Sequence, residues 1–300
     1  MRAPDESERD TDSVATWLRS LSAGQRLSQA GQTVLNNAMA RPEKASYITA
    51  SELAQQSGTS ISSVTRLAQR LGFNGWPDLQ REIRVRYMAH LSLVDVDTAH
   101  ETTDSPFQAS LRWDLESLSA SLLNADETQV ERVVGLLSGA KNIYVTAQGS
   151  FAAVGHALNH NIQIAGYPAR GLLDIPANIA NTVVQMGPED VLIVCSYWRI
   201  YGVAVTAATE AHARGSKVIV ITDNLPPALA QCADEVLLVP AEGTSFFPSL
   251  TSAMALQQGI VASLARVDPE KTRRSLIEME NSWQTFQMLH RSAPGHRPDL

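Results

Sequence analysis

The spacing of apolar residues divides the chain into two halves of different character. Before about residue 123, apolar side chains recur every three or four positions, a period that predicts helices over 16–39, 49–88 and 107–123. In the last of these, Leu111, Leu115, Leu118 and Leu122 share one face. After residue 140, the runs IYVTA, VLIVC, VIVIT and VLLV are short, continuous and rich in Val and Ile. Such runs predict strands that are buried on both faces.

The order of these elements indicates the fold class of the second half. Helix-like segments that end in glycine, FAAVGHALNHNIQIAG and YGVAVTAATEAHARG, separate the apolar runs, and a further apolar helical stretch covers 248–265. Strands that alternate with helices are typical of a parallel sheet covered on both faces. We therefore expect an all-α N-terminal domain followed by a three-layer α/β domain with a central parallel sheet.

Changes in composition mark the expected boundaries. Residues 92–106, SLVDVDTAHETTDSP, are acidic, rich in Pro, Ser and Thr, and weakly periodic, so they predict an interdomain linker. Residues 1–13 carry five carboxylates and hardly any apolar side chain, which predicts disorder. The predicted organisation is a disordered segment 1–13, a helical domain 14–91, a linker and connecting helix 92–125, an α/β domain 126–265, and a C-terminal helix and tail 266–300.

Composition narrows the class of protein. A chain of 300 residues is long enough for two cores, and no apolar run approaches the length of a membrane helix. The polar, acidic start differs from a signal peptide, so we expect a cytoplasmic protein. The two cysteines, Cys195 and Cys232, have no His or Cys at ligand spacing, which predicts no disulfide and no structural zinc site. We expect no cofactor. A net charge of −7 argues against nonspecific coating of nucleic acid but permits one small basic face.

The segment SELAQQSGTSISSVTRLAQRLG, residues 51–72, has the spacing of a helix-turn-helix. Ala54 provides the small side chain where two helices approach, Gly58 suits a turn with positive φ, and Ser60 can cap the second helix by accepting from the amide of Ser62 or Ser63. Gly72 can end that helix as its C′ residue. The residues expected to face inward are Val64, Leu67, Ala68 and Leu71.

The opposite face of the second helix carries polar side chains and no carboxylate. Hydroxyl groups and free amides at a helix N-terminus can meet phosphates and base edges, and Arg can bind guanine with two hydrogen bonds. The alternative is a small helical hairpin with an ordinary polar surface. The candidate DNA-binding residues are Ser60, Ser62, Ser63, Thr65, Arg66, Gln69 and Arg70.

The stretch ITASELAQQSGTSISSVTRLAQRLGFNGWPDLQREI resembles the N-terminal domain of the RpiR-type bacterial transcription regulators. The similarity covers about 27–87 and includes the LA pair, the turn glycine and RLGFNGWPDLQ, in which Trp76 stands at the second aromatic position. We interpret Phe73, Trp76 and Leu79 as core residues and Gly75 as the turn between them.

Residues 126–265 are similar to the sugar isomerase (SIS) domain that these regulators carry. The similarity rests on IYVTAQGSFAAVGHAL, PEDVLIVCSYW and ARGSKVIVITDNLPPALAQCADEVLLVP. In that family, hydroxyl groups on loops and helix N-termini hold the phosphate of a sugar phosphate, which the helix dipole stabilises. The resemblance therefore implies a small-molecule effector such as a sugar phosphate.

The second phosphate loop departs from the family pattern SxSGxT. Residues 196–201 read SYWRIY, so Ser196 remains while the second Ser, the Gly and the Thr are absent. Arg199 can replace neutral donors with a charge-assisted grip on an anion, and Trp198 and Tyr201 can stack on a ring. The alternative is that the loop packs against a partner subunit and binds nothing.

The first loop keeps the family pattern better. Gln148, Gly149 and Ser150 precede the predicted helix, and Ser150 is either a ligand hydroxyl or only a helix cap. Thr222 ends the third apolar run, at the edge where open parallel sheets bind ligands. The next residue, Asp223, also lies at this edge, and its side chain can either face a ligand or cap the following turn. The candidate effector-binding residues are Gln148, Gly149, Ser150, Ser196, Trp198, Arg199, Tyr201 and Thr222.

Three functions are compatible with these residues. An isomerase needs a base and a proton shuttle, but Glu242 has no identifiable partner, and His156 and His160, four apart, lack a third metal ligand. A sugar-phosphate isomerase and a regulator whose SIS domain only forms oligomers remain the alternatives. The favoured prediction is a regulator without enzymatic activity that binds a double-stranded DNA operator as a homodimer or homotetramer, does not bind membranes, and senses an anionic or phosphosugar-like metabolite.

Overall fold

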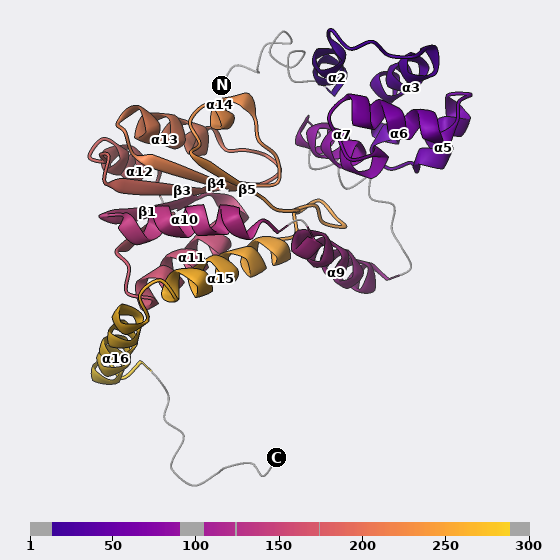
Figure 1. Cartoon of the computed structure of the whole chain (residues 1–300). Helices are drawn as coiled ribbons and strands as arrows, with labels where there is room; N and C mark the ends of the chain where they lie inside the picture. The colour runs from indigo at the N-terminus through magenta and orange to yellow at the C-terminus, as the bar shows by residue number, and fades with distance from the viewer. Residues whose placement is uncertain (1–13, 91–104, 124, 174, 289–300) are drawn as a thin grey trace, which may run out of the picture. The chain divides into compact units, whose positions relative to one another are not determined.

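A computed structural model describes residues 14–90, 105–123, 125–173 and 175–288 (Figure 1). The predicted disorder of 1–13, most of the predicted linker and the end of the predicted tail lie outside these residues. The chain divides into two compact units. The helical unit comprises Met1–Asp114 and Glu242–Ser249, and the α/β unit comprises Leu115–Ala241 and Leu250–Leu300.

The helical unit is built from short, well-capped helices. Ser28 caps α3 by accepting from the amide of Gly31, and Thr49 and Glu52 form a reciprocal capping box at the start of α5. These caps satisfy amides that short helices would otherwise leave unpaired. The helices are α2 Val14–Ser22, α3 Gln29–Ala40, α4 Pro42–Ala45, α5 Ala50–Gln56, α6 Ile61–Arg70 and α7 Trp76–His90.

One core holds the helical unit together. Trp76 is 1% exposed, and its indole Nε1 donates to the carbonyl oxygen of Ile48 at 3.1 Å. Leu79 is equally buried, and Phe73 packs edge-on against Trp17 with ring centroids 6.1 Å apart. The interpretation of Phe73, Trp76 and Leu79 as core residues is confirmed.

The α/β unit contains a parallel five-stranded sheet in the order β2-β1-β3-β4-β5. Because β1 and β3 lie inside the sheet, their residues are almost all buried, as the continuous apolar runs predict. The expected three-layer α/β fold is confirmed. The strands are β1 Asn142–Ala147, β2 Ala169–Leu172, β3 Asp190–Cys195, β4 Lys217–Thr222 and β5 Glu235–Leu238.

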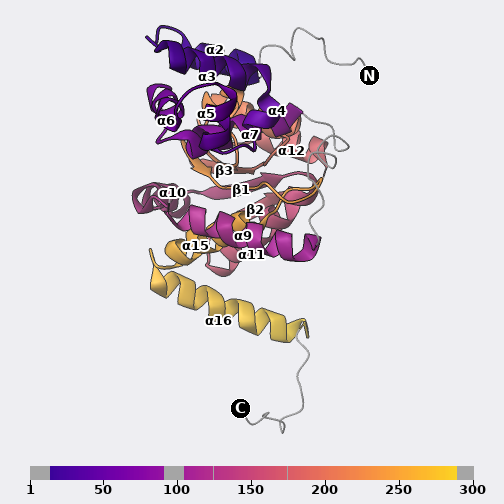
Figure 2. The same ribbon diagram turned by 90° about the vertical axis from the view of Figure 1, so that its right-hand side faces the viewer.

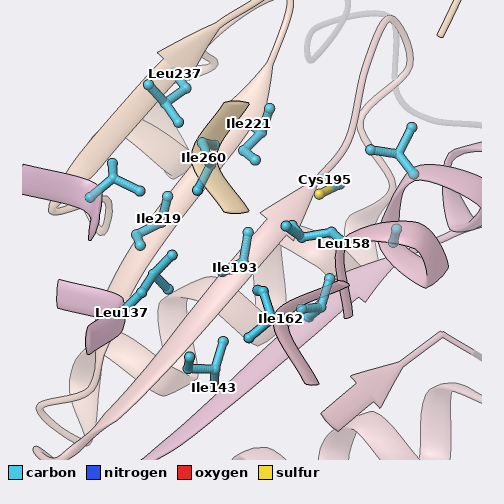
Figure 3. Packing of buried hydrophobic residues seen from close by; sticks show 14 of the residues in the cluster. Leu137, Ile143, Leu158, Ile162, Ile193, Cys195, Ile219, Ile221, Leu237 and Ile260 are labelled. Atoms are coloured by element: carbon cyan, nitrogen blue, oxygen red, sulfur yellow. The ribbon is translucent and has the colours of Figure 1, made fainter. Parts of the chain in front are cut away.

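Helices cover both faces of this sheet (Figures 1 and 2). In Figure 3, Leu137, Leu158, Ile162 and Ile260 surround Ile193 on one face. The opposite face packs against α12, α13 and α14. The helices are α10 Glu127–Gly139, the 3₁₀ turn η1 Gly149–Phe151, α11 Ala152–Ile164, α12 Pro176–Val183, α13 Gly202–Ala213, α14 Pro227–Ala230, α15 Thr251–Ala265 and α16 Pro269–Thr285.

Strand β2 is not among the strands predicted from the sequence. Its four residues, ARGL, include exposed Arg170 and Gly171, and it pairs only with β1 at the edge of the sheet. An edge strand needs no apolar run, so periodicity does not reveal it. In the part of the chain that the structure describes, every helix is too short or too polar to cross a bilayer.

Candidate functional site

Helices α5 and α6 form the predicted helix-turn-helix. Gly58 has φ +60°, a conformation that glycine adopts without strain, and Thr59 N–H donates to the Ala54 carbonyl at 2.9 Å. Ala54 is buried where the two helices meet, and Gly72, with φ +95°, follows the end of α6. The predicted positions of the turn and of the helix end are therefore confirmed.

Ser60 caps α6, as predicted. Its Oγ accepts from the Ser63 amide at 3.3 Å and lies 2.8 Å from the Oγ of Ser62. Ser63 itself departs from the expected outward position, because it is only 8% exposed and its Oγ lies 3.0 Å from that of Ser60. The physical reason is helical periodicity: Ser63 precedes inward-facing Leu67 by four residues. The structure places Ser63 in the cap rather than on the outer face.

The outer face of α6 presents the other candidate residues. Ser62, Arg66, Gln69 and Arg70 are exposed, and the Arg66 guanidinium donates to the Ser62 hydroxyl at 3.3 Å. Thr65 is half-buried, and its hydroxyl donates to the Ile61 carbonyl at 3.2 Å. The first turn of the helix has no acidic residue, so nothing there repels phosphate.

Ile61 belongs to this face but is not among the candidate residues from the sequence. Its side chain is 52% exposed at the first position of α6. An apolar group at this place can contact the methyl group of thymine, while the polar neighbours bind base edges. Ile61 was missed at the sequence level because only polar side chains were considered for this face.

Helix α7 contributes less free positive charge than its arginines suggest. Arg81 forms an ion pair with Asp78, and Arg86 forms one with Glu82 at 3.8 Å. Within the helical unit, Arg84 binds Glu242 at 2.6 Å. Glu242, for which the sequence showed no partner, is therefore ion-paired. The exposed arginines of α6 are more available to DNA than those of α7.

In the α/β unit, strand register brings the effector candidates to one edge of the sheet. Cys195 is aligned with Ala147 on β1 and with Ile221 on β4. The residues that follow these three are Gln148, Ser196 and Thr222, so all three lie at the carboxyl ends of adjacent strands. Ligands of open parallel sheets bind at such an edge.

Two buried polar groups at this edge have no hydrogen-bond partner among the described residues. They are the Oγ of Ser196 and the Oε1 of Gln148. The amide nitrogen of Gln148 donates to Thr146 Oγ1 at 2.9 Å, which fixes the orientation of the side chain. A buried polar group without a partner costs free energy, so both groups would gain from a ligand that hydrogen-bonds to them.

Tyr201 lies directly against the first loop. Gly149 has φ +60°, and a Cβ atom placed on it would lie 2.5 Å from the Tyr201 hydroxyl oxygen. The Tyr201 ring also packs edge-on against Phe151, with centroids 6.0 Å apart. Ser150 is exposed and is the N-cap of neither η1 nor α11, so the helix-cap alternative is wrong, and the ligand role stays a prediction.

The second loop is fixed to the end of β4. Trp198, with φ 53°, donates its N–H to the carboxylate of Asp223 at 2.7 Å, and Asn224 Nδ2 donates to the Trp198 carbonyl at 3.1 Å. Arg199 is exposed and stacks on Trp198, 5.2 Å from the ring centroid. Thr222 is fully buried and donates to the Asn224 carbonyl at 2.6 Å, so it shapes the loop rather than facing a ligand.

The buried carboxyl of Asp223 should make stability depend on pH. Burial raises its pKa from the ordinary value to about 6, and hydrogen bonds such as that from the Trp198 N–H oppose this rise only in part. Because the folded state holds the proton more tightly, this contribution to stability is fully present below about pH 4 and is lost as the pH rises through 6. We expect Asp223→Asn to remove this pH-dependent contribution. The free energy of unfolding of the variant, relative to that of the wild type, should then rise by up to about 3 kcal/mol between pH 4 and pH 7.

Urea unfolding of both proteins at several pH values measures this difference. A control is Asp190→Asn, which alters another buried carboxylate whose Oδ2 accepts from the Gly187 amide at 2.9 Å. If Asp223→Asn and the wild type change in parallel with pH, the carboxyl of Asp223 does not titrate in this range.

Other titratable groups give little support for catalysis. Burial raises the pKa of the Cys195 thiol to about 12, so it is not a nucleophile at neutral pH. His156 and His160 are both exposed on α11. Among the described residues, no group of three or more His, Cys, Asp or Glu side chains is placed to hold a metal ion.

Family models match both parts of the chain. Residues 17–89 match the model described as helix-turn-helix domain, rpiR family, and residues 136–264 match the SIS domain. A relative from Escherichia coli K12, named as the uncharacterized HTH-type transcriptional regulator YfhH, is 27% identical over 223 residues, which cover 73% of this chain and 79% of the relative.

Solved structures agree with this division. The sugar isomerase domain of an RpiR transcription factor from Sphaerobacter thermophilus is similar with a TM-score of 0.57 and 26% identity, over 60% of this chain and 99% of that one. The Vibrio vulnificus NanR protein, complexed with ManNAc-6P, is similar in fold with a TM-score of 0.57 and 20% identity, over 93% of this chain and 100% of that one.

Proposed function

The chain belongs to the RpiR-type transcriptional regulators, since it joins an rpiR-family helix-turn-helix domain to a SIS domain, and we propose that it binds a specific DNA operator in response to a small anionic metabolite. The observation that carries the DNA part is the outer face of α6. Exposed Arg66, Gln69 and Arg70 stand there beside a serine-capped N-terminus without a carboxylate. Such a face suits the major groove, and a DNA partner implies a cytoplasmic location.

The carboxyl edge of the sheet supports the effector part of the proposal. Ser196 and Gln148 offer buried polar atoms without partners among the described residues, and Arg199 offers an exposed cation. The ligand named for the NanR structure, ManNAc-6P, combines hydroxyl groups with a phosphate. The Ser196 hydroxyl can donate to such a ligand, Gln148 Oε1 can accept from a sugar hydroxyl, and Arg199 can bind the phosphate. We propose that this chain senses a ligand of the same class, an anionic sugar derivative.

Binding of DNA can be tested without knowledge of the operator. Purified protein is incubated with a pool of genomic fragments at two salt concentrations, together with an unrelated competitor. Selective retention of particular fragments is the expected result, because base contacts survive competition better than phosphate contacts. Uniformly weak, salt-sensitive retention would contradict a sequence-specific regulator.

Replacing Arg199 with alanine should weaken binding of an anion selectively. We expect the affinity for ManNAc-6P or inorganic phosphate, measured by calorimetry, to fall about 10-fold or more, because a charge-assisted hydrogen bond contributes roughly 1.5–3 kcal/mol. The matched control is Arg214→Ala, which removes a cation from the end of α13, where Arg214 pairs with Glu210 at 3.5 Å. Equal affinity of wild type and Arg199→Ala would mean that this loop does not bind the anion.

We further propose that the SIS domain binds its ligand without converting it. Two observations support this proposal. The raised pKa of the Cys195 thiol keeps it protonated, and the Glu242 carboxylate forms an ion pair with Arg84. An isomerase needs a free base and a proton shuttle at the ligand. The proton exchange that accompanies aldose–ketose interconversion can be followed by NMR in D₂O, and exchange catalysed by the pure protein would favour the enzyme.

A further inference from the structure

Helix α15 carries a polar side chain in the middle of its buried stripe. The residues of this stripe recur every three or four positions and are at most 2% exposed: Ala253, Gln257, Ile260 and Leu264. Neither the Oε1 nor the Nε2 atom of Gln257 has a hydrogen-bond partner among the described residues. A buried amide without partners destabilises a fold, because it gives up its hydrogen bonds to water. Packing alone therefore does not explain a glutamine at this position.

Gln257 lies near the carboxyl edge of the sheet, because α15 runs from that edge to the opposite one. Near the end of the helix, the Leu264 carbonyl accepts from the hydroxyl of Tyr167, which precedes β2, at 3.2 Å. Ile260 packs on the sheet close to Ile221, the last but one residue of β4 (Figure 3). Gln257 is three residues nearer the start of α15, which is about 4.5 Å closer to the carboxyl edge. It therefore lies at the level where the strands end.

Two more buried side chains on this face of the sheet have polar atoms without regular partners. Tyr197 is fully buried and belongs, like Cys195, to the core that α15 covers. Its hydroxyl lies beside the Cys195 thiol, a weak hydrogen-bonding group, and makes no regular hydrogen bond within the described residues. Ser252, in the first turn of α15, is 2% exposed, and its Oγ likewise has no partner there. Together, Tyr197, Ser252 and Gln257 form what is named the α15 polar cluster.

The α15 polar cluster lies behind the first loop of the proposed effector site. The ring of Phe151, at the end of η1, packs edge-on against Tyr197 with centroids 5.3 Å apart, and against Tyr201 at 6.0 Å. All these residues belong to the α/β unit. Because the cluster is enclosed, a ligand bound at the edge of the sheet reaches it when these rings move aside.

We propose that the α15 polar cluster binds the neutral, hydroxyl-bearing end of the anionic metabolite, an inference that rests on the proposed function and extends it to the second end of the ligand. All three side chains are neutral, and a buried charge would be costly among them, so the group that they bind is neutral. Each can both donate and accept a hydrogen bond. The Gln257 amide can donate to one hydroxyl and accept from the next, which fits the vicinal hydroxyl groups of a sugar or polyol.

Replacement of Gln257 by methionine tests this assignment, because methionine keeps the length of the side chain and removes both amide atoms. Calorimetry compares inorganic phosphate with ManNAc-6P, glucose 6-phosphate and fructose 6-phosphate. We expect the wild type to bind at least one of the sugar phosphates about 10-fold or more tightly than inorganic phosphate. Gln257→Met should reduce that preference by about 10-fold, while its affinity for inorganic phosphate stays unchanged.

Two other variants control for damage to the fold. Gln258→Met makes the same change at the next residue of α15, which is exposed, and should bind every probe as the wild type does. Tyr197→Phe keeps the ring against Phe151 and loses only the hydroxyl, so it should lower the sugar preference several-fold without changing the affinity for phosphate. The thermal midpoint of Gln257→Met should not fall, because its amide has no partner among the described residues to lose.

Each outcome decides the proposal. Loss of the sugar preference in Gln257→Met and Tyr197→Phe, but not in Gln258→Met, supports it. A wild type that binds no sugar phosphate better than inorganic phosphate, or a Gln257→Met variant that keeps the preference, would overturn it and leave the cluster to bound water only. A lower thermal midpoint of Gln257→Met, with unchanged affinities in Tyr197→Phe, would assign the glutamine to the fold and overturn it too.

Failure of the proposed function gives a different result. If Arg199→Ala does not weaken phosphate binding, or no genomic fragment is selected, while Gln257→Met still reduces the sugar preference, the anion or DNA part of that function fails and the assignment of the α15 polar cluster stands.

Discussion

Replacement of Trp76 by alanine is expected to destabilise the helical unit by about 3–5 kcal/mol, because a large buried side chain is lost and the cavity closes only in part. Trp76 is 1% exposed and lies in one core with residues of α2, α3, α5 and α6. The hydrogen bond to Ile48 matters less, since the same carbonyl also accepts from Gln80 Nε2 at 2.5 Å. Loss of packing therefore dominates the effect.

Hydrogen exchange of backbone amides separates this effect from general unfolding. In Trp76→Ala, amides of α6 should exchange faster, while amides of β1 and β3 in the α/β unit keep their protection. Trp76→Phe is the matched control, because it keeps an aromatic ring and removes only the N–H, and it should cost much less. Equal loss of protection in both units would show that they unfold together, and no change in α6 would show that Trp76 is not a core residue.

Local signals predicted the helix-turn-helix well. Ser60, Gly58 and Gly72 occupy the cap, turn and stop positions expected from their spacing, because each follows from rules that act over four or five residues. The parallel sheet was equally predictable, since strands buried on both faces produce continuous apolar runs. Strand β2 and helix α12 were missed, because one has no apolar run and the other is short.

Contacts between distant segments could not be read from the sequence. Tyr201 lies against Gly149 across 52 positions, and the Trp198 amide binds Asp223 across 25. The spacing of residues along one element says nothing about which loops meet at the edge of a sheet. Ser63 shows the converse, because its inward position was predictable from the position of Leu67 and was overlooked in favour of its hydroxyl group.

Replacement of Arg66 by glutamate is expected to reduce operator affinity by about 100-fold to 1000-fold. An arginine that binds a base contributes roughly 1–3 kcal/mol, and a carboxylate in its place adds repulsion from the phosphates. The protein should still fold, because Arg66 is exposed and, among the described residues, its side chain hydrogen-bonds to the Ser62 hydroxyl of its own helix. Arg66→Ala should give an intermediate loss.

Titration of a selected fragment at several salt concentrations distinguishes the kind of contact that Arg66 makes. If Arg66 binds a phosphate, Arg66→Ala lowers affinity for all sequences alike and reduces the salt slope by about one; if it binds a base, the loss is confined to fragments with one particular base pair. The control Arg170→Ala removes one exposed cation from β2 and should leave both quantities unchanged. If Arg66→Glu leaves the affinity unchanged, α6 is not the recognition helix, because a carboxylate on a helix face that contacts DNA must lower the affinity.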